Sequence, residues 1–257
     1  MSQRQERPTD GDYVQSLDRG LAVIRAFGAE HPRLTLSEAA ARAGISRAAA
    51  RRLLLTLQGL GYVASEDGKH FALRPAVLDL GYAYLASLPW WREAQRHIGP
   101  LAARLGHPCA VGVLDGAEVV YVAYAAPNPV AGLDRSVGTR LPAHATAIGR
   151  VLLAGLEPSH AATILGRARL EAYSPFTETV VERLLASLDD VRRQGSCLVD
   201  QELRLGLRSL GVPIPGRDGR VRAGLSMSYG LMDSPDGNAM RRELQAAAEA
   251  IGLSVAA

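Results

Sequence analysis

The pattern of hydrophobic and polar positions changes character along the chain. Within the first 75 residues, apolar side chains recur at helical spacing in residues 13–30, 34–45 and 46–60. Two short alternating runs, 62–65 and 70–73, follow, and the sequence Glu-Asp-Gly-Lys between them is typical of the turn of a β-hairpin. Three helices followed by a hairpin predict a winged helix-turn-helix.

Residues suited to helix caps indicate where these helices begin and end. Ser16 and Ser37 are expected to cap the first and second helices, and Ser46 the third. Gly44 can adopt the left-handed conformation that ends a helix, so it supplies the turn between the second and third helices. The third helix is therefore the one expected to enter a DNA groove.

The third helix has an apolar face and a basic face. Five residues at helical spacing are expected to pack inward: Ala50, Leu53, Leu54, Leu57 and Leu60. The opposite face carries small side chains and guanidinium groups, which can reach phosphates or guanine edges. No acidic residue lies between Glu38 and Glu66, and this favours a surface that faces phosphate. The alternative is an ordinary solvated helix with surface arginines.

The expected contacts with double-stranded operator DNA come from the helices and from the tip of the wing. They are Ser37, Ser46, Arg47, Ala48, Arg51, Arg52, Lys69 and His70. At the wing the alternative is an ordinary polar turn, because Glu66 and Asp67 lie beside the basic residues.

A helical linker is predicted over residues 76–89. Pro89 ends this helix. Its apolar positions form one face, which consists of Val77, Leu80, Tyr84, Leu85 and Leu88. Because operator half-sites favour two-fold symmetric proteins, this face is expected to pair with its counterpart in a homodimer or homotetramer. The alternative is packing on its own domain alone.

In the rest of the chain, segments with apolar residues at helical spacing are interspersed with segments in which apolar and polar residues alternate. Helices are predicted at 91–105, 143–154, 157–165, 180–194 and 236–251, and strands at 110–114, 119–123, 197–199, within 206–215, and at 221–229, where the last strand closes the sheet. This is an α+β domain with an antiparallel sheet flanked by helices. The predicted organisation is a disordered tail (1–12), the winged helix-turn-helix (13–75), the linker helix (76–89) and a sensor domain (90–257).

Composition and charge narrow the class of protein. The net charge is +3, and residues 1–75 hold eleven Lys and Arg against eight Asp and Glu, so the basic excess lies in the predicted DNA-binding segment. The sequence has no apolar run of about eighteen residues and no secretory leader, so a cytoplasmic protein without a membrane partner is expected. Cys109 and Cys197 lack metal-ligand spacing, and no metal or cofactor is predicted.

Three segments of the second half place polar residues in apolar surroundings. In the first, a helix entered through Leu141-Pro142-Ala143 would offer backbone N–H groups to an anion, with Arg140, His144 and Thr146 nearby. The other two are 197–202 and the pair 207–210 with 225–228, where Ser226 and Ser228 share one strand face. The alternative is that these groups only bond their neighbours.

Three residues of the second half would also suit an enzyme. Cys197, His144 and Asp200 are residue types of a nucleophile, a base and an orienting group, which would suit a hydrolase-like enzyme or binding module with an accessory DNA-binding head. The sequence has no nucleophile elbow, glycine-rich phosphate loop or zinc motif. These absences favour a protein that is not an enzyme.

Several segments closely resemble the IclR-type bacterial transcriptional regulators: YVQSLDRGLAVIRAF, LTLSEAAARAGISRAAARRLLLTLQGLGYV and RPAVLDLGYAYL. The resemblance runs to near the C-terminus and implies a GAF-like effector-binding domain. The segments SVGTRLPAHATAIGRVLLA and VRRQGSCLVDQELRLGLRSLGVPI are most similar to the branch controlling protocatechuate and 4-hydroxybenzoate catabolism, which implies a small organic acid, such as an aromatic one, as effector.

The resemblance also suggests which residues line the effector pocket. The family's pocket positions fall on Ala147, Ile148, Asp200, Ser209, Ser226 and Ser228. Ile148 departs from the small residue common in some members, which would narrow the cavity. With the polar groups named above, the predicted effector-binding set is Arg140, His144, Thr146, Ala147, Ile148, Cys197, Asp200, Ser209, Ser226 and Ser228.

Overall fold

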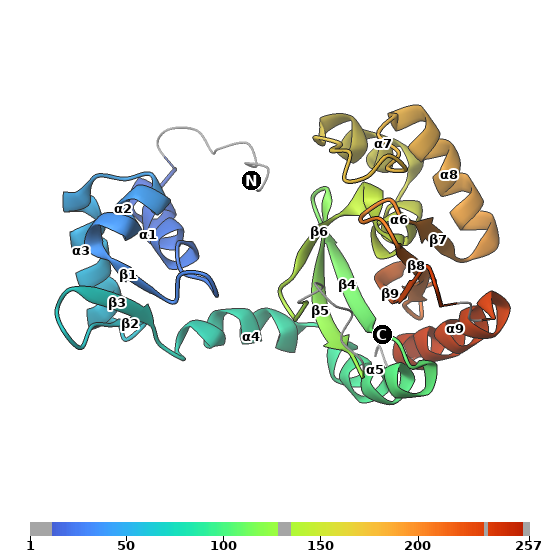
Figure 1. Cartoon of the computed structure of the whole chain (residues 1–257), viewed down its shortest axis with the longest axis horizontal. Coiled ribbons are helices and arrows are strands. Elements are labelled where there is room, and N and C mark those ends of the chain that lie inside the picture. Colours follow the sequence, from blue (N-terminus) through green and yellow to red (C-terminus); the bar gives the residue numbers. More distant parts are fainter. Residues whose placement is uncertain (1–11, 128–134, 234–235, 254–257) are drawn as a thin grey trace. The chain divides into compact units, whose positions relative to one another are not determined.

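The computed structural model describes residues 12–127, 135–233 and 236–253, and the chain forms two compact units that divide between Ser87 and Leu88 (Figure 1). The tail predicted at 1–12 lies outside the described residues except for Asp12, as does much of the loop predicted between Pro127 and Thr139. Each unit has its own hydrophobic core.

The first unit is the predicted winged helix-turn-helix with one additional strand. Its elements are α1 (Gln15–Arg25), β1 (Arg33–Thr35), α2 (Leu36–Ala43), α3 (Arg47–Gly59), β2 (Val63–Ala64) and β3 (His70–Leu73). The strands form an antiparallel sheet in the order β1-β3-β2, in which β1 was not predicted from the sequence. The core joins helices and sheet through Val23, Leu34, Leu54, Val63 and Phe71.

The caps of the helix-turn-helix differ in part from the prediction. Thr35, and not Ser37, caps α2: its hydroxyl accepts a hydrogen bond from the Glu38 backbone N–H (3.3 Å), and the Glu38 carboxylate accepts one from the Thr35 N–H (2.7 Å). Pairing of Thr35 with His70 in the sheet keeps Thr35 in the extended conformation that a cap needs, so the helix starts before Ser37. Ser37 is an exposed residue within the first turn.

Of the other predicted helix ends, one prediction was wrong and two are confirmed. Ser16 lies inside α1, whose N-cap is Val14, so its predicted capping role was wrong. Gly44 has φ 65° and ends α2, and the Ser46 hydroxyl accepts a hydrogen bond from the Ala49 N–H (3.2 Å), as predicted. The turn between α2 and α3 is thus set by a left-handed glycine and a serine cap.

The linker contains the predicted helix, α4 (Val77–Ser87), and none of its residues is buried. Large apolar side chains remain exposed along it; Leu78 retains 72% and Leu80 51% of its accessible surface. Among the described residues, contacts therefore leave much of the apolar surface of α4 exposed.

The second unit is built on a six-stranded antiparallel sheet in the order β6-β5-β4-β9-β8-β7. Its elements are α5 (Trp91–Leu105), β4 (Cys109–Asp115), β5 (Glu118–Ala125), β6 (Arg140–Pro142), η1 (Ala143–Ala145), α6 (Ala147–Ala154), α7 (Pro158–Arg167), α8 (Val181–Gln194), β7 (Cys197–Asp200), β8 (Leu207–Pro215), β9 (Val221–Gly230) and α9 (Gly237–Leu253). β9 lies between β4 and β8, so the prediction that residues 221–229 close the sheet was wrong.

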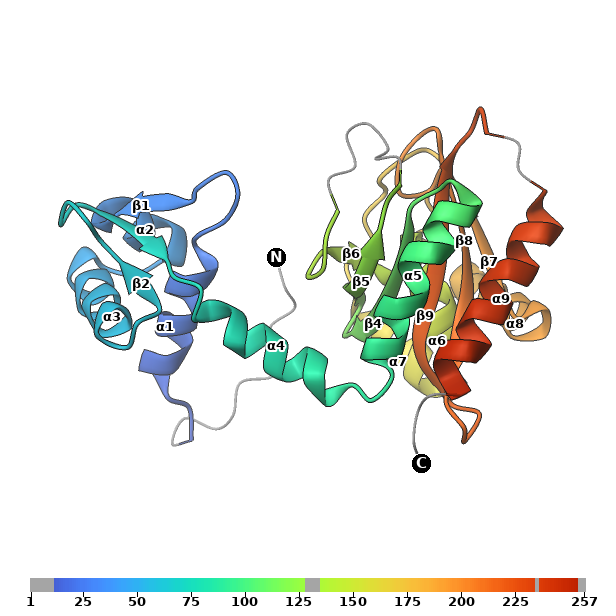
Figure 2. The same cartoon turned by 90° about the horizontal axis from the view of Figure 1, so that it is seen from below.

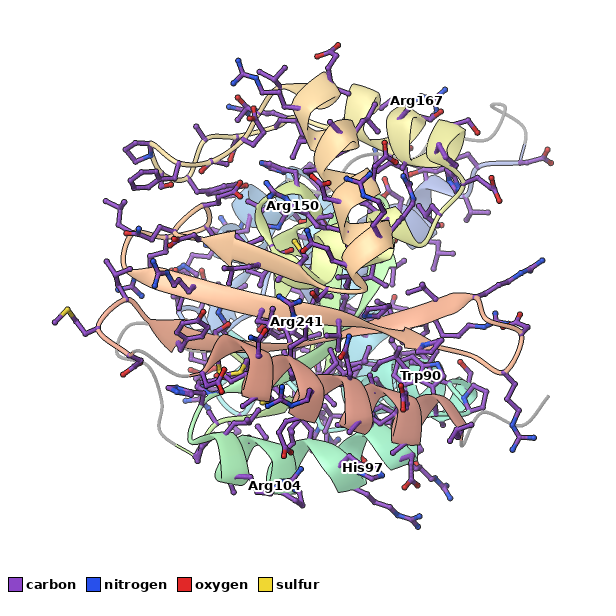
Figure 3. All side chains as sticks on the ribbon, turned by 90° about the vertical axis from the view of Figure 1, so that its right-hand side faces the viewer. Trp90, His97, Arg104, Arg150, Arg167 and Arg241 are labelled. Atoms are coloured by element: carbon purple, nitrogen blue, oxygen red, sulfur yellow. The ribbon has the colours of Figure 1, made fainter. Side chains whose placement is uncertain are left out.

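Helices cover both faces of this sheet. α5 and α9 lie side by side on one face (Figure 2), and α6 lies on the other with α7 and α8 outside it (Figure 3). The start of α6 approaches the strands closely: a Cβ on Gly211 would lie 2.9 Å from the Ala147 carbonyl carbon, and one on Gly224 would lie 2.9 Å from Ile148 Cγ2. These two glycines let α6 settle directly on β8 and β9.

The capping box of α2 gives a direct test of the fold. Thr35→Ala removes the hydroxyl that caps the helix, a loss of about 1 kcal/mol. We expect amide hydrogen exchange over residues 36–43 to become about fivefold faster through local opening. Ser37→Ala is the matched control and should leave these exchange rates unchanged. Equal acceleration in both variants would contradict the assignment of the cap to Thr35.

Candidate functional site

The basic face of α3 is open to solvent. Arg47, Ala48, Arg51 and Arg52 are all exposed, while Ala50, Leu54 and Leu57 are buried in the core of the first unit. Leu60 follows the end of the helix and keeps 64% of its surface exposed, so its predicted inward packing was wrong. The helix therefore presents three guanidinium groups and a small side chain on its free surface, as a groove-reading helix requires.

Arg42 belongs to the same basic stretch but has a structural contact. Its Nε donates to the Ala26 carbonyl oxygen at 2.9 Å, which ties α2 to the end of α1. This bond holds α2 at a fixed position relative to the C-terminal end of α1.

At the wing tip, the Asp67 carboxylate is held by several hydrogen bonds beside the basic residues Lys69 and His70. Asp67 accepts hydrogen bonds from the backbone N–H groups of His70 (2.7 Å) and Lys69 (2.9 Å), and its other oxygen lies 2.6 Å from His70 Nδ1. The bonds from His70 hold the pKa of Asp67 well below its usual range. Lys69 and His70 are exposed, but the charged Asp67 reduces the attraction of this tip for phosphate.

The second unit contains two adjoining cavities that share Tyr121, Arg135, Ser226 and Ser228. The larger is otherwise lined by Leu141, Ala145, Thr146, Ala147, Ile148, Val199, Leu203, Leu207 and Ser209. The smaller adds Pro108, Cys109, Ala110 and Tyr124. The walls are mostly apolar with a few polar groups, which is typical of a small-molecule site.

Arg135 is the cation of these cavities. Its Nη1 lies 3.5 Å from the Tyr121 hydroxyl oxygen, and its guanidinium lies 6.0 Å from the centre of the Tyr121 ring. Burial raises the pKa of Tyr121, so its hydroxyl stays protonated beside the Arg135 guanidinium. A guanidinium in such surroundings can bind a carboxylate.

The predicted serines come together at the cavity. The Ser209 and Ser228 hydroxyl oxygens lie 2.8 Å apart across β8 and β9, and Ser226 lies two residues before Ser228 on the same face. Thr146 also lines the cavity, but its hydroxyl caps α6: it donates to the Pro142 carbonyl (2.9 Å) and accepts from the Gly149 N–H (3.2 Å).

The helix start predicted at Ala143 was wrong. Residues 143–145 form a single 3₁₀ turn, and α6 begins only at Ala147, after the Thr146 cap. The anion site predicted at Ala143 therefore has no α-helix behind it.

Four of the predicted effector residues do not line the cavities. Arg140 pairs with Asp115 (2.5 Å) and Glu118 (2.9 Å) at the exposed sheet edge. Asp200 accepts two hydrogen bonds from Arg208, both of 3.0 Å, and His144 Nε2 lies 3.0 Å from the Glu171 carbonyl oxygen. The polar groups of Arg140, Asp200 and His144 are thus bonded to neighbours that the sequence alone does not reveal. Cys197 is buried and lies outside the cavity lining.

The structure also brings in residues that the sequence did not single out. Arg135 comes from a segment interpreted only as a Pro- and Gly-rich loop, and Tyr121 from a strand interpreted only as half of a hairpin. The alternation of β5 would have placed Tyr121 on one sheet face, but nothing in the sequence shows that this face meets Arg135.

A buried ion pair lies behind the cavity wall (Figure 3, which labels Arg150). Arg150 Nη2 is 2.5 Å from Glu202 Oε2, and Arg150 Nε donates to the His144 carbonyl at 2.9 Å. Glu202 also accepts from the Glu178 backbone N–H at 3.0 Å. The sequence pattern gave no signal for this pair, because its members are 52 positions apart.

Comparison with known families decides the class of the protein. The profile described as "Bacterial transcriptional regulator IclR C-terminal" matches residues 82–253, and that of the "IclR helix-turn-helix domain" matches residues 16–67. The chain belongs to the IclR family. The resemblance seen in the sequence is thereby confirmed, and the protein is a DNA-binding transcriptional regulator.

Two bacterial regulatory proteins are similar to this chain over most of its length. The Pca regulon regulatory protein of Pseudomonas putida is 43% identical over 220 residues, which cover 85% of this chain and 75% of that protein. The p-hydroxybenzoate hydroxylase transcriptional activator of Acinetobacter baylyi is 37% identical over 220 residues, covering 84% of this chain and 81% of that protein.

Two solved structures of bacterial proteins have the same fold. A regulator from Rhodococcus sp. RHA1 is 40% identical with a TM-score of 0.83, over 94% of this chain and 98% of that one. An IclR homologue from Microbacterium hydrocarbonoxydans, solved with 4-hydroxybenzoate, has a TM-score of 0.84 over 93% of this chain and 98% of that one. Because the identity to the Microbacterium protein is 23%, that similarity is evidence for a shared fold and not for a shared ligand.

The chemistry of the polar groups bears on the enzyme alternative. Burial raises the pKa of Cys197 to about 11, so its thiol is not activated as a nucleophile, and burial lowers the pKa of His144. Among residues 12–127, 135–233 and 236–253 no group of three or more His, Cys, Asp or Glu side chains could hold a metal ion. In the same part of the chain no helix is long and apolar enough to cross a membrane.

The reactivity of Cys197 can be measured directly. Because its pKa is about 11, Cys197 is almost wholly protonated at pH 7.5. We expect iodoacetamide to alkylate it roughly a hundredfold more slowly than free cysteine, with a rate that rises as the pH approaches 11. Mass spectrometry after timed quenching separates it from Cys109. Alkylation faster than that of free cysteine at pH 7.5 would revive the enzyme alternative.

Proposed function

We propose that this IclR-family regulator binds operator DNA through α3 and responds to a small aromatic carboxylic acid bound in the cavities of its second unit. The effector's carboxylate would pair with Arg135 and the serine hydroxyls, and its ring would lie against Tyr121 and the aliphatic wall. The regulated genes would be catabolic genes for such acids, and the protein would act in the cytoplasm.

One observation supports this proposal above the others. Arg135, Ser226 and Ser228 share a cavity with Tyr121 and with apolar side chains of β7, β8 and α6. An aromatic acid needs this combination, because its carboxylate requires charge-assisted hydrogen bonds while its ring requires an apolar slot. The names of the two similar regulators, which refer to the Pca regulon and to p-hydroxybenzoate hydroxylase, point to the same class of genes.

A two-fold assembly is part of the proposal. The exposed Leu78 and Leu80 of α4 offer apolar surface that the described chain does not bury itself, and a palindromic operator would be read by paired α3 helices. The effector can change DNA binding only if it has different affinities for two arrangements of these paired heads. A homodimer or homotetramer would supply such arrangements.

The deciding experiment is fluorescence anisotropy with DNA from the upstream intergenic region of the protein's own gene. At fixed salt, binding is compared with and without protocatechuate and 4-hydroxybenzoate, with random DNA as control. Sequence-preferring binding that one acid shifts is the expected result. Binding that neither acid shifts would overturn the effector class and leave the regulator. No preference over random DNA would overturn the role of α3.

Arg52→Ala tests the DNA contact. Loss of one guanidinium from the free face of α3 should weaken operator binding by about tenfold, since a contact to a base edge contributes about 1–3 kcal/mol. Arg220→Ala is the matched control, because Arg220 is an exposed arginine of the second unit. Anisotropy titrations of both variants at the same salt concentration should separate them. Equal weakening would indicate general charge attraction only.

Arg135→Ala tests the effector contact. Without the guanidinium, the dissociation constant for the acid should rise by about tenfold or more, while operator binding without effector stays unchanged. Arg140→Ala is the control, since Arg140 is paired with Asp115 and Glu118 outside the cavities. Calorimetric titration measures both. Loss of affinity in Arg140→Ala but not in Arg135→Ala would reverse the assignment.

The serine hydroxyls can be removed together. Ser226→Ala with Ser228→Ala is expected to abolish the effector response and to preserve operator binding in its absence, because both residues line the cavities of the second unit and the Ser228 hydroxyl is bonded there to Ser209. Anisotropy with and without the acid gives both quantities. Parallel loss of DNA binding and effector response would contradict a separate sensor site.

A further inference from the structure

Arg150 and Glu202 carry full charges in the interior of the second unit. Their side chains retain 8% and 11% of their accessible surface, and their closest atoms are 2.5 Å apart. Removing both charges from water is costly, and the attraction of a buried pair often does no more than offset that cost. Stability alone therefore gives a weak reason for placing an arginine and a glutamate here.

The remaining hydrogen bonds of the pair connect three separate segments. Arg150 Nε holds the carbonyl of His144 in the 3₁₀ turn before α6. Glu202 Oε2 accepts from the Glu178 N–H, and the Glu202 carbonyl accepts from the Thr177 hydroxyl at 2.5 Å. The pair thus ties the turn before α6, the segment before α8 and the loop between β7 and β8 to one point.

Two of these segments continue directly into the cavity walls. Ala145, Thr146, Ala147 and Ile148 follow His144, and Leu203 and Leu207 follow Glu202. Neither Arg150 nor Glu202 lines either cavity. The pair can therefore act on a bound molecule only through the positions of these walls.

We propose that Arg150 and Glu202 are positioning residues for the effector cavity: their directional bonds hold the wall of residues 145–148 and the wall of residues 203–207 at the spacing that a ligand requires. This inference rests on the proposed function, in which the cavity binds the effector. A preformed site binds more tightly because less ordering occurs on binding.

Arginine suits this task better than lysine. Its Nε and Nη2 reach two different acceptors, the His144 carbonyl and the Glu202 carboxylate. A lysine ammonium is one compact donor group on a flexible stem and cannot reproduce that fork. Arg150→Lys keeps the charge pair possible but gives up one of the two directional bonds.

The test separates positioning from stability with full-length variants. Arg150→Met and Glu202→Leu each leave one buried charge unpaired and should lower the melting temperature by about 10 °C. The double variant removes both charges and should recover most of that loss. Calorimetry then measures the dissociation constant for whichever of protocatechuate and 4-hydroxybenzoate the wild type binds. Arg222→Met, which breaks the exposed 2.7 Å pair with Asp218, is the control.

Positioning predicts that affinity does not follow stability. The double variant and Arg150→Lys should bind the acid about tenfold more weakly than the wild type although they melt within a few degrees of it. Recovery of wild-type affinity together with the melting temperature in the double variant, and unchanged affinity in Arg150→Lys, would overturn the proposal.

A second readout keeps this test independent of the effector's identity. Amide hydrogen exchange without ligand over residues 145–149 and 203–207 should be faster in Arg150→Lys and in the double variant than in the wild type. Unchanged exchange there would overturn the positioning role. If the wild type binds neither acid while these segments loosen as expected, the proposed effector class fails and the positioning role stands.

Discussion

One buried ion pair, between the Arg150 guanidinium and the Glu202 carboxylate, joins three segments of the second unit. Arg150 and Glu202 can leave water only because each satisfies the other and because backbone groups take up further hydrogen-bonding capacity. That requirement fixes the turn before α6 and the loop after β7 together. Gly211 and Gly224 add the second constraint, since they allow α6 to lie directly on the strands. The walls of the cavity follow from these two conditions.

The first unit is organised by a different kind of constraint. Its core is a small cluster of aliphatic side chains around one phenylalanine, and its geometry is set by local caps at Thr35, Gly44 and Ser46. Because the apolar side of α3 supplies the packing, Arg51 and Arg52 on its other side remain exposed. Arg42, one helix earlier, is held by a backbone carbonyl. Arginines of one basic stretch thus have different roles.

The cavity lining combines polar groups with titratable side chains that burial keeps neutral. Tyr121 and Cys109 have raised pKa values because they are buried, the latter about 12, so both remain neutral near pH 7. Arg135 then carries the charge of the lining, and Ser209 and Ser228 already hydrogen-bond each other. Such a lining offers an anion charge-assisted hydrogen bonds, as the proposed effector site requires. This matches a family whose members regulate transcription.

The sequence by itself determined the elements whose signals are local. Helical spacing, the Gly44 turn and the Ser46 cap predicted the helix-turn-helix, and alternation placed Ser226 and Ser228 on one face. Tertiary structure decided what depends on distant partners. Sheet pairing made Thr35 the cap in place of Ser37, and Asp115 and Glu118 engaged Arg140 while Arg135 reached the cavity. Folding alone joined Arg150 to Glu202, because hydrogen bonds and ion pairs act over a few ångströms of space at any separation in sequence.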